Sequence, residues 1–362
     1  MVVEGDIMNG LKRLQEYLVE EQLNGIVILS RSNLHYFAGF SGTTGCAFVT
    51  PEKAYFVADS RYIEQAQAQA EGYEVLLMQK SHFATLKPIL SEYQLETLAF
   101  EGNQIPYDTV KTMQETFGDN ITYRSITLEG IRAVKREDEL LIMQKAATIA
   151  DEAFAVLLTQ VKPGMTEDEA RIILEGEMLK RGSEGPSFDT IVASGHRSSM
   201  PHGVASSKVM EEGDFVTFDF GAIYKGYHSD ITRTIVLGKA SEEQKELYKA
   251  VLAAQELGLS LVRPGISGKE LDRMVRDALA EKGYGDYFQH GLGHGVGLDI
   301  HEKPVTSPIS NDVLEENMVV TIEPGVYFPG KHGIRIEDSV IVKASGAVRL
   351  TNTTKELLEI NN

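Results

Sequence analysis

The chain has only one cysteine, few basic side chains for its many acids, and no long apolar segment. Cys46 alone cannot form an intrachain disulfide, which excludes a disulfide scaffold and a zinc site built on cysteine pairs. Its context, residues 44–49 (TGCAFV), is typical of the beginning of a buried strand, so we expect a structural thiol. The scarcity of cysteine also favours a reducing compartment.

The shortage of positive charge limits the partners that the protein can bind. Its 35 lysines and arginines are outnumbered by 53 aspartates and glutamates, which gives a formal net charge of −18. Nucleic acid and anionic membranes require basic patches, so neither is an expected partner. No apolar run reaches the roughly 20 residues that span a bilayer. Residues 1–6 lack the positive start of a signal peptide, and we predict a cytoplasmic protein.

A length of 362 residues favours two domains. Residues 11–125 alternate short strand-like and helical segments, which predicts an α/β domain with a mixed sheet. The expected strands are at residues 25–29 and 53–57, and the expected helices at residues 60–71 and 107–117.

A charged stretch, residues 132–139, follows this first region and is expected to begin a long amphipathic helix. Its apolar face would include Leu140, Leu141 and Met143. No Gly/Ser or Pro run marks a flexible linker there. We therefore predict directly adjoining domains of residues 1–128 and 129–362.

The second half of the chain repeats itself. Residues 161–166 (VKPGMT) return at 262–267 (VRPGIS), and residues 216–221 (VTFDFG) return at 320–325 (VTIEPG). The two offsets agree closely, and at about a hundred residues they are far longer than solenoid periods. Two equivalent structural repeats are therefore predicted, in which each copy of the first motif lies between two helices.

The repeat carries acidic residues in equivalent places. Asp219 corresponds to Glu323, and the strand that follows each of them is preceded by a second acid, Asp230 or Glu337. Each half therefore supplies two carboxylates, one from each strand of a β-ribbon, and packing the halves together would gather all four. The repulsion among clustered carboxylates is relieved most completely by a bound divalent metal.

A glycine-rich stretch offers the nitrogen ligand. Residues 290–302 (HGLGHGVGLDIHE) place His290, His294 and His301 among four glycines. Glycine lets the backbone approach a bound group closely, and histidine serves as ligand, hydrogen bonder or proton carrier near neutral pH. We expect this segment to be functional, with one histidine completing a five-ligand set.

This stretch resembles the signature of the pita-bread-fold metallopeptidases, which comprise Xaa-Pro aminopeptidases (aminopeptidase P) and prolidases. Residues 198–203 (SSMPHG) and 333–338 (GIRIED) are similar to two other active-site segments of that family, and residues 30–40 and 59–62 to its creatinase-type N-terminal domain. The family's metal-ligand order is matched by Asp219, Asp230, His294, Glu323 and Glu337.

The fold that this resemblance implies has two parts. The N-terminal domain would be α/β and creatinase/ribonuclease-H-like. The catalytic domain would be an α+β pita-bread domain with an internal pseudo-twofold repeat. The resemblance further implies a homodimer.

The resemblance also implies the chemistry. Two divalent ions, expected to be Mn²⁺ with Co²⁺, Fe²⁺ or Zn²⁺ as alternatives, would share a bridging hydroxide that attacks the scissile carbonyl. Glu323 resembles the family's proton-shuttling glutamate. His202 and His301 resemble the residues that stabilise the tetrahedral intermediate. His290 would line the proline-side pocket, and Arg335 would hold ligands and histidines in place.

Two peptidase functions compete for these residues, and the substrates of both are proline-containing peptides. A Xaa-Pro aminopeptidase releases the N-terminal residue when proline is second, whereas a Xaa-Pro dipeptidase (prolidase) must also pair the free carboxylate of a dipeptide, usually with arginine. Between His301 and Glu323, where some prolidases place that arginine, this chain has Lys303 and no arginine. The aminopeptidase is therefore the preferred prediction, with the dipeptidase as its alternative.

Three further alternatives are less favoured. Methionine aminopeptidases use the same five ligands but lack this N-terminal domain, and creatinase shares the fold but not the metal site. A catalytically inactive pita-bread binding protein is the alternative of another class. Such proteins typically lose metal ligands, whereas all five are present here.

Overall fold

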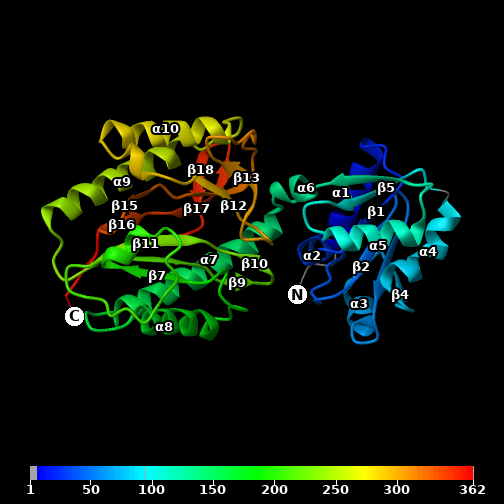
Figure 1. The fold of residues 1–362 in the computed structure, drawn as a ribbon, viewed down its shortest axis with the longest axis horizontal. Coiled ribbons are helices and arrows are strands. Elements are labelled where there is room, and N and C mark those ends of the chain that lie inside the picture. The colour runs from blue at the N-terminus through cyan, green and yellow to red at the C-terminus, as the bar shows by residue number, and fades with distance from the viewer. Residues whose placement is uncertain (1–5, 94, 362) are drawn as a thin grey trace. The chain divides into compact units, whose positions relative to one another are not determined.

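The computed structural model describes residues 6–93 and 95–361, without the side chains of residues 6–9. Two compact units divide between Arg132 and Ala133, and each is described here by itself (Figure 1). The predicted boundary of the folding domains, between residues 128 and 129, stays a prediction. Within the described residues, every helix is too short or too polar to cross a bilayer.

The first unit is built on a mixed β-sheet, as predicted. Its strand order is β4-β3-β2-β1-β5-β6, and β1 pairs antiparallel with β2 but parallel with β5. Both predicted strands are confirmed, as β1 and β3, and Cys46 begins β2 as a fully buried thiol. The strands are β1 (Ile26–Ile28), β2 (Cys46–Val49), β3 (Ala54–Ala58), β4 (Glu74–Leu77), β5 (Thr97–Glu101) and β6 (Thr122–Ile126).

Helices of the first unit pack on this sheet. Leu86 of α4 and Met113 of α5 are buried in one cluster with Val27 and Phe48 of the strands. The predicted helix at residues 107–117 is confirmed as α5, and the one at 60–71 is a shorter α3. The helices are α1 (Asp6–Glu20), α2 (Arg31–Ala38), α3 (Ile63–Gln69), α4 (His82–Tyr93) and α5 (Tyr107–Phe117).

The charged stretch at residues 132–139 differs from the prediction. Arg132 belongs to the short helix α6 (Glu129–Ala133), and the predicted long helix, α7 (Glu137–Leu158), begins only at Glu137 within this stretch. Leu140 and Met143 are buried as expected, but Leu141 is 72% exposed. Successive helical residues point in different directions, so the apolar face that takes Leu140 cannot also take its neighbour.

The second unit contains two halves of the same design. In each half a pair of helices covers an antiparallel ribbon, and Figure 1 shows the two helix pairs on opposite sides of the strands. The first half contains α7, α8 (Glu167–Lys180), η1 (Gly195–Ser199), β7 (Ile191–Ser194), β8 (Phe215–Phe220), β9 (Ile223–Tyr224), β10 (Tyr227–His228) and β11 (Ile231–Leu237). The second contains α9 (Glu242–Leu261), α10 (Gly268–Glu281), η2 (Gly285–Tyr287), β12 (Gly293–Gly295), β13 (Glu302–Thr306), β14 (Val319–Ile322), β15 (Gly325–Phe328), β16 (His332–Arg335), β17 (Asp338–Lys343) and β18 (Gly346–Arg349). A last strand, β19 (Glu359–Ile360), pairs with β11.

The repeated Pro-Gly motif forms the same turn between helices in both halves. Gly164 and Gly265 have φ of 93° and 87°, a left-handed conformation that glycine adopts without strain. Thr166 and Ser267 then cap α8 and α10 by accepting hydrogen bonds from backbone N–H groups of the first turn, both at 3.1 Å. Such a cap stabilises a helix by about 1 kcal/mol. The local physics of the two copies is therefore the same.

The equivalent ribbons bring the acidic residues to the centre of the unit. In the first ribbon Asp219 lies opposite Thr232 of β11, and in the second Ile322 lies opposite Asp338 of β17. The backbone N–H of Glu337 donates to the carbonyl of Thr232 at 3.1 Å, which joins the two ribbons. Apolar side chains of α7 and α8 cover one ribbon and those of α9 and α10 the other.

Candidate metal centre and substrate cavity

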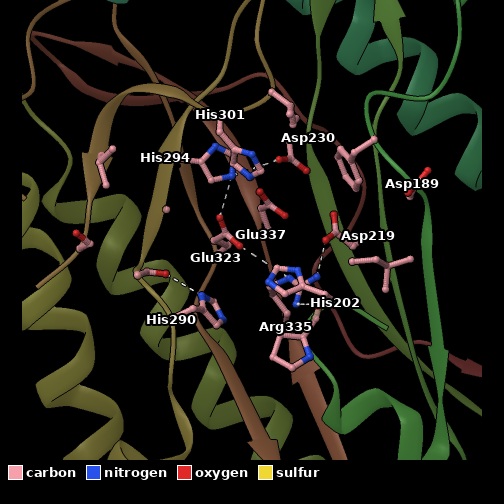
Figure 2. A pocket seen from close by; sticks show the side chains of 18 of the residues that line it. Asp189, His202, Asp219, Asp230, His290, His294, His301, Glu323, Arg335 and Glu337 are labelled. Atoms are coloured by element: carbon pink, nitrogen blue, oxygen red, sulfur yellow. Dashed lines mark hydrogen bonds and ion pairs between the residues drawn. The ribbon is translucent and has the colours of Figure 1, made fainter. Parts of the chain in front are cut away.

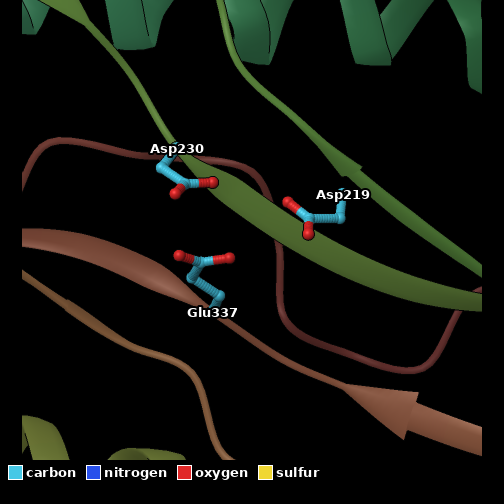
Figure 3. A group of neighbouring side chains, drawn as sticks. All are labelled: Asp219, Asp230 and Glu337. Carbon is cyan, nitrogen blue, oxygen red and sulfur yellow. The ribbon is translucent and has the colours of Figure 1, made fainter. Parts of the chain in front are cut away.

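Three carboxylates meet where the ribbons join (Figure 3). Asp219 lies on β8, Asp230 directly precedes β11 and Glu337 directly precedes β17. One oxygen of each lies within 4.8 Å of the others. The predicted convergence of acids from both halves is thus present in the structure.

The cluster leaves buried oxygens without partners. Among the described residues, Asp219 Oδ1, Asp230 Oδ1 and Glu337 Oε1 are buried and accept no hydrogen bond. Burial and the negative neighbours raise the pKa of Asp230 and of Glu337 well above the ordinary value of a carboxyl. An unpartnered buried carboxylate oxygen is costly, so this arrangement calls for protons or cations.

Glu323 and His294 complete the predicted set of five. Glu323 directly follows β14, and Thr321 donates a hydrogen bond to its Oε1 at 3.0 Å. His294 Nε2 lies 3.3 Å from Glu323 Oε1 and 3.6 Å from Asp230 Oδ2. Burial raises the pKa of Glu323 to about 7 and lowers the pKa of His294.

The orientation of His294 fits a cation. Its Nδ1 lies 3.1 Å from the carbonyl of Gly295, so in the neutral ring we assign the hydrogen to Nδ1. The bare Nε2 then faces oxygens of Glu323 and Asp230 that also carry lone pairs. A divalent cation among these atoms would turn the repulsion into coordination, and four carboxylates with one imidazole suit Mn²⁺ and similar ions.

Arg335, the last residue of β16, supports the cluster. Its guanidinium donates to Asp219 Oδ2 at 2.5 Å, to the hydroxyl of Tyr327 at 2.7 Å and to the hydroxyl of Thr232 at 3.1 Å. Thr232 in turn donates to Glu337 Oε2 at 2.6 Å. One arginine therefore orients carboxylates from both halves.

The remaining histidines differ in how they are held. His290 has both ring nitrogens engaged, Nδ1 with the carbonyl of Gly291 at 2.8 Å and Nε2 with the hydroxyl of Tyr327 at 3.1 Å. Burial lowers the pKa of His290 to about 3, so this ring is a neutral wall. His202 and His301 are exposed, and among the described residues the ring of neither makes a side-chain hydrogen bond. Both can therefore meet a substrate.

All nine predicted site residues line one cavity of about 520 Å³ (Figure 2). Sequence analysis did not predict the apolar and small walls of the cavity, because their residues outside the 290–302 stretch belong to no recognisable motif: Phe188, Ile191, Val204, Val305 and Ser307. It also missed Asp189. The strand there pairs as Ile191↔Asp219 and as Pro186↔Ala222, so two extra residues bulge between these pairs and direct Phe188 and Asp189 to the cavity.

Comparison with known proteins identifies the family of this chain. Residues 142–344 match metallopeptidase family M24, and residues 11–134 match the creatinase/prolidase N-terminal domain. The chain belongs to metallopeptidase family M24, whose members depend on divalent metal. The predicted resemblance and the predicted fold class are both confirmed.

Several relatives are similar over nearly the full length. A Xaa-Pro dipeptidase of Pyrococcus furiosus is 40% identical over 353 residues, which cover 96% of this chain and 99% of that protein. The solved structure of a Xaa-Pro dipeptidase from Bacillus anthracis is 43% identical with a TM-score of 0.94, covering 97% of this chain and 99% of that one. An X-Pro aminopeptidase from Thermotoga maritima is 38% identical with a TM-score of 0.89, covering 96% and 99%.

The raised carboxyl pKa values predict how Mn²⁺ binding depends on pH. In the metal-free fold Asp230, Glu323 and Glu337 hold protons more tightly than in the unfolded chain. For Glu323 this contribution to stability is fully present below its unfolded-chain pKa of about 4.3 and is lost as the pH rises through its folded-state pKa of about 7. Mn²⁺ must displace these protons below neutral pH, so its affinity and its thermal stabilisation should be greater at pH 8 than at pH 5.5.

Titration calorimetry at pH 6, in two buffers of different ionisation enthalpy, counts the protons released. We expect at least one proton per protein molecule. Binding without proton release would contradict the raised pKa values.

Proposed function

We propose that this metallopeptidase is a Xaa-Pro dipeptidase (prolidase), which cleaves the bond before proline in dipeptides. The observation that carries the proposal is the cavity in which the five-residue cluster meets His202, His290 and His301. Full-length relatives named as Xaa-Pro dipeptidases favour this function over our preferred sequence prediction, the aminopeptidase. Relatives named as peptidases likewise disfavour the inactive binding protein.

The five residues Asp219, Asp230, His294, Glu323 and Glu337 would hold the metal. When bound, divalent ions supply Lewis-acid polarisation of the substrate carbonyl and make water more acidic. Mn²⁺ as that metal, two ions per chain, a homodimer and a cytoplasmic location belong to the same proposal.

Glu323 would move the proton. Its Oε1 is engaged by Thr321, which leaves Oε2 toward the cavity and 3.9 Å from Arg335 Nε. A carboxylate at this position can take up a proton from the attacking water and return it to the leaving nitrogen of proline.

The exposed histidines would stabilise the developing charge. Burial and the neighbouring His294 lower the pKa of His301, so it is a neutral ring that can still donate one N–H bond. His202 belongs to the first half of the unit, where it lies in the loop after η1. Hydrogen bonds from the two rings to the substrate carbonyl oxygen would strengthen as that oxygen becomes an anion. The imide nitrogen of proline offers no hydrogen, so the ring needs only a wall such as His290.

One observation favours the aminopeptidase as a second candidate. Arg335 is the only arginine or lysine among the described residues that line the cavity, and it is buried and bonded to Asp219 and Tyr327. Lys303 is paired with Asp312 at 3.0 Å. The free carboxylate of a dipeptide therefore finds no unpaired arginine or lysine there, and Val305 supplies an apolar wall instead.

Turnover of Xaa-Pro against Xaa-Pro-Xaa under Mn²⁺ tests the choice. A dipeptidase should give a higher kcat/KM for the dipeptide, and a clear preference for the tripeptide would favour the aminopeptidase. Val305→Arg introduces a cation at the cavity wall, and a charge-assisted pair with the dipeptide carboxylate is worth about 1.5–3 kcal/mol. The variant should raise the dipeptide-to-tripeptide ratio about 10- to 100-fold. Val305→Met, which lengthens the side chain without charge, is the matched control.

A further inference from the structure

A buried ion pair lies beneath the histidine-bearing segment. Lys135, between α6 and α7, reaches Glu302 at the beginning of β13, with 2.5 Å between Nζ and Oε1. The two side chains are 1% and 2% exposed. Glu302 directly follows His301, so the pair joins the start of the catalytic unit to the segment that presents His294 and His301.

The carboxylate of Glu302 fills the inside of the turn between β12 and β13. Its Oε2 accepts a hydrogen bond from the backbone N–H of Asp299 at 3.4 Å. A Cβ at Gly297 would lie 2.4 Å from Glu302 Oε1, so only glycine leaves room for the carboxylate there. Gly297 in turn donates from its backbone N–H to the carbonyl of Asp299 at 3.1 Å. The turn is thus shaped around the carboxylate.

Lys135 is fixed at its backbone as well. Its N–H donates to the carbonyl of Asn317 at 3.0 Å, and the preceding Val134 forms a β-bridge with Met318. These residues lead into β14, which pairs with β12 at Gly295. The lysine therefore links the residues that lead into β14 to the end of the turn at Glu302.

A buried ion pair of this kind is poorly explained by stability. Desolvating an ammonium and a carboxylate costs several kcal/mol per ion, and apolar residues of similar size often stabilise a fold as well or better. The pair can instead position the turn, because its hydrogen bonds fix where the turn lies. The register shift between His294 and Gly295 in β12 leaves the orientation of His294 dependent on that turn.

We propose that Lys135 and Glu302 are positioning residues that hold the turn so that His294 Nε2 faces the carboxylates and His301 faces the cavity. The inference rests on the proposed function, in which His294 is a metal ligand. It assigns to the pair the tuning of metal affinity and turnover, beyond any effect on folding.

Three variants test the pair, each measured for melting temperature, for Mn²⁺ affinity by calorimetry on the metal-free protein, and for kcat and KM on a Xaa-Pro dipeptide. Lys135→Met leaves Glu302 buried and unpaired, and should lower the melting temperature. It should also lower Mn²⁺ affinity and kcat, each by about 10- to 100-fold, which is the usual effect of removing a residue that orients a metal ligand. Lys135→Met/Glu302→Leu should recover the melting temperature but neither Mn²⁺ affinity nor kcat. Lys245→Met, which breaks the exposed pair with Glu242 on α9, should leave the melting temperature, Mn²⁺ affinity, kcat and KM unchanged.

Recovery of Mn²⁺ affinity and kcat in the double variant would overturn the proposal, because the pair would then serve folding alone. The double variant decides the matter by itself if Lys135→Met does not fold. Failure of the proposed function is a separate outcome, seen when wild-type protein binds Mn²⁺ but cleaves no Xaa-Pro peptide. In that case the Mn²⁺ affinities still test the positioning role.

Discussion

Glu337→Gln is expected to abolish peptidase activity and yet to make the metal-free protein more stable. Glu337 lies in the carboxylate cluster, where burial and its acidic neighbours raise its pKa well above the ordinary value. The substitution removes one of the repelling charges and leaves an oxygen to accept the hydrogen bond from Thr232. Its amide N–H₂ can donate to neighbouring carboxylates, including the unpartnered Asp230 Oδ1.

We expect this gain to be about 2 kcal/mol, or roughly 4–8 °C in melting temperature at pH 8. The same change removes a proposed metal ligand, so Mn²⁺ should no longer stabilise the variant. Differential scanning calorimetry with chelator and with Mn²⁺ measures both effects. Glu316→Gln, an exposed acid outside the cavity, is the matched control and should change neither. A metal-free Glu337→Gln protein that melts below the wild type would contradict the account of the cluster.

Glu323→Gln is expected to lower kcat by a factor of about 10²–10⁴, the usual size of a general acid–base contribution. Glutamine keeps the shape of the side chain and an oxygen for the Thr321 hydroxyl, but it cannot take up and return a proton. The loss should therefore appear in kcat more than in KM. Metal analysis of the purified variant must accompany the kinetics, because Glu323 is also a proposed ligand.

Thr321→Val tests how the position of the Glu323 carboxylate matters while its ability to carry a proton is kept. The Thr321 hydroxyl donates to Glu323 Oε1 and accepts from the backbone N–H of His294, both at 3.0 Å. The valine variant keeps the Glu323 carboxylate but removes the hydrogen bond that positions it. We therefore expect a smaller loss of kcat, about 10-fold, within the range for residues that orient a metal ligand. A Glu323→Gln variant that binds Mn²⁺ and retains more than a tenth of the wild-type kcat would exclude Glu323 as the proton carrier.

Much of the site could be predicted from the sequence because its residues repeat. Asp219 and Glu323 lie at the same point of two similar strands, and this equivalence predicts that the acids of both halves lie together. The nine predicted residues all line one cavity. The turns between helices could also be predicted, because the Pro-Gly turn and its Thr or Ser cap depend only on residues a few positions apart.

Contacts between distant segments that carry no motif or repeat could not be predicted. Tyr327, which links His290 to Arg335, has no motif of its own, and Val305 reaches the cavity wall only because β13 pairs with β12. The bulge at Phe188 and Asp189 depends on a change of register with β8. The exposed Leu141 shows a different limit of prediction. The composition of a segment indicates that it is apolar but does not fix which face of the helix each residue occupies.

The duplication has a consequence for the symmetry of the metal site. The acids occupy equivalent places in both halves, but His294, the proposed nitrogen ligand, has no counterpart in the first half. β7 pairs with β8 as β12 pairs with β14, and the residue equivalent to His294 is Ala193. A Cβ at Gly203, next to His202, would lie 3.1 Å from the Ala193 side chain, so the loop that brings His202 occupies the place a second imidazole would need.

Identical half-chains pairing about the same axis would have made a centre with equal sides. The two halves of the present chain differ, because the proposed imidazole ligand His294 lies on one side and the exposed His202 on the other. Cations on the two sides would therefore differ in affinity and in exchange rate.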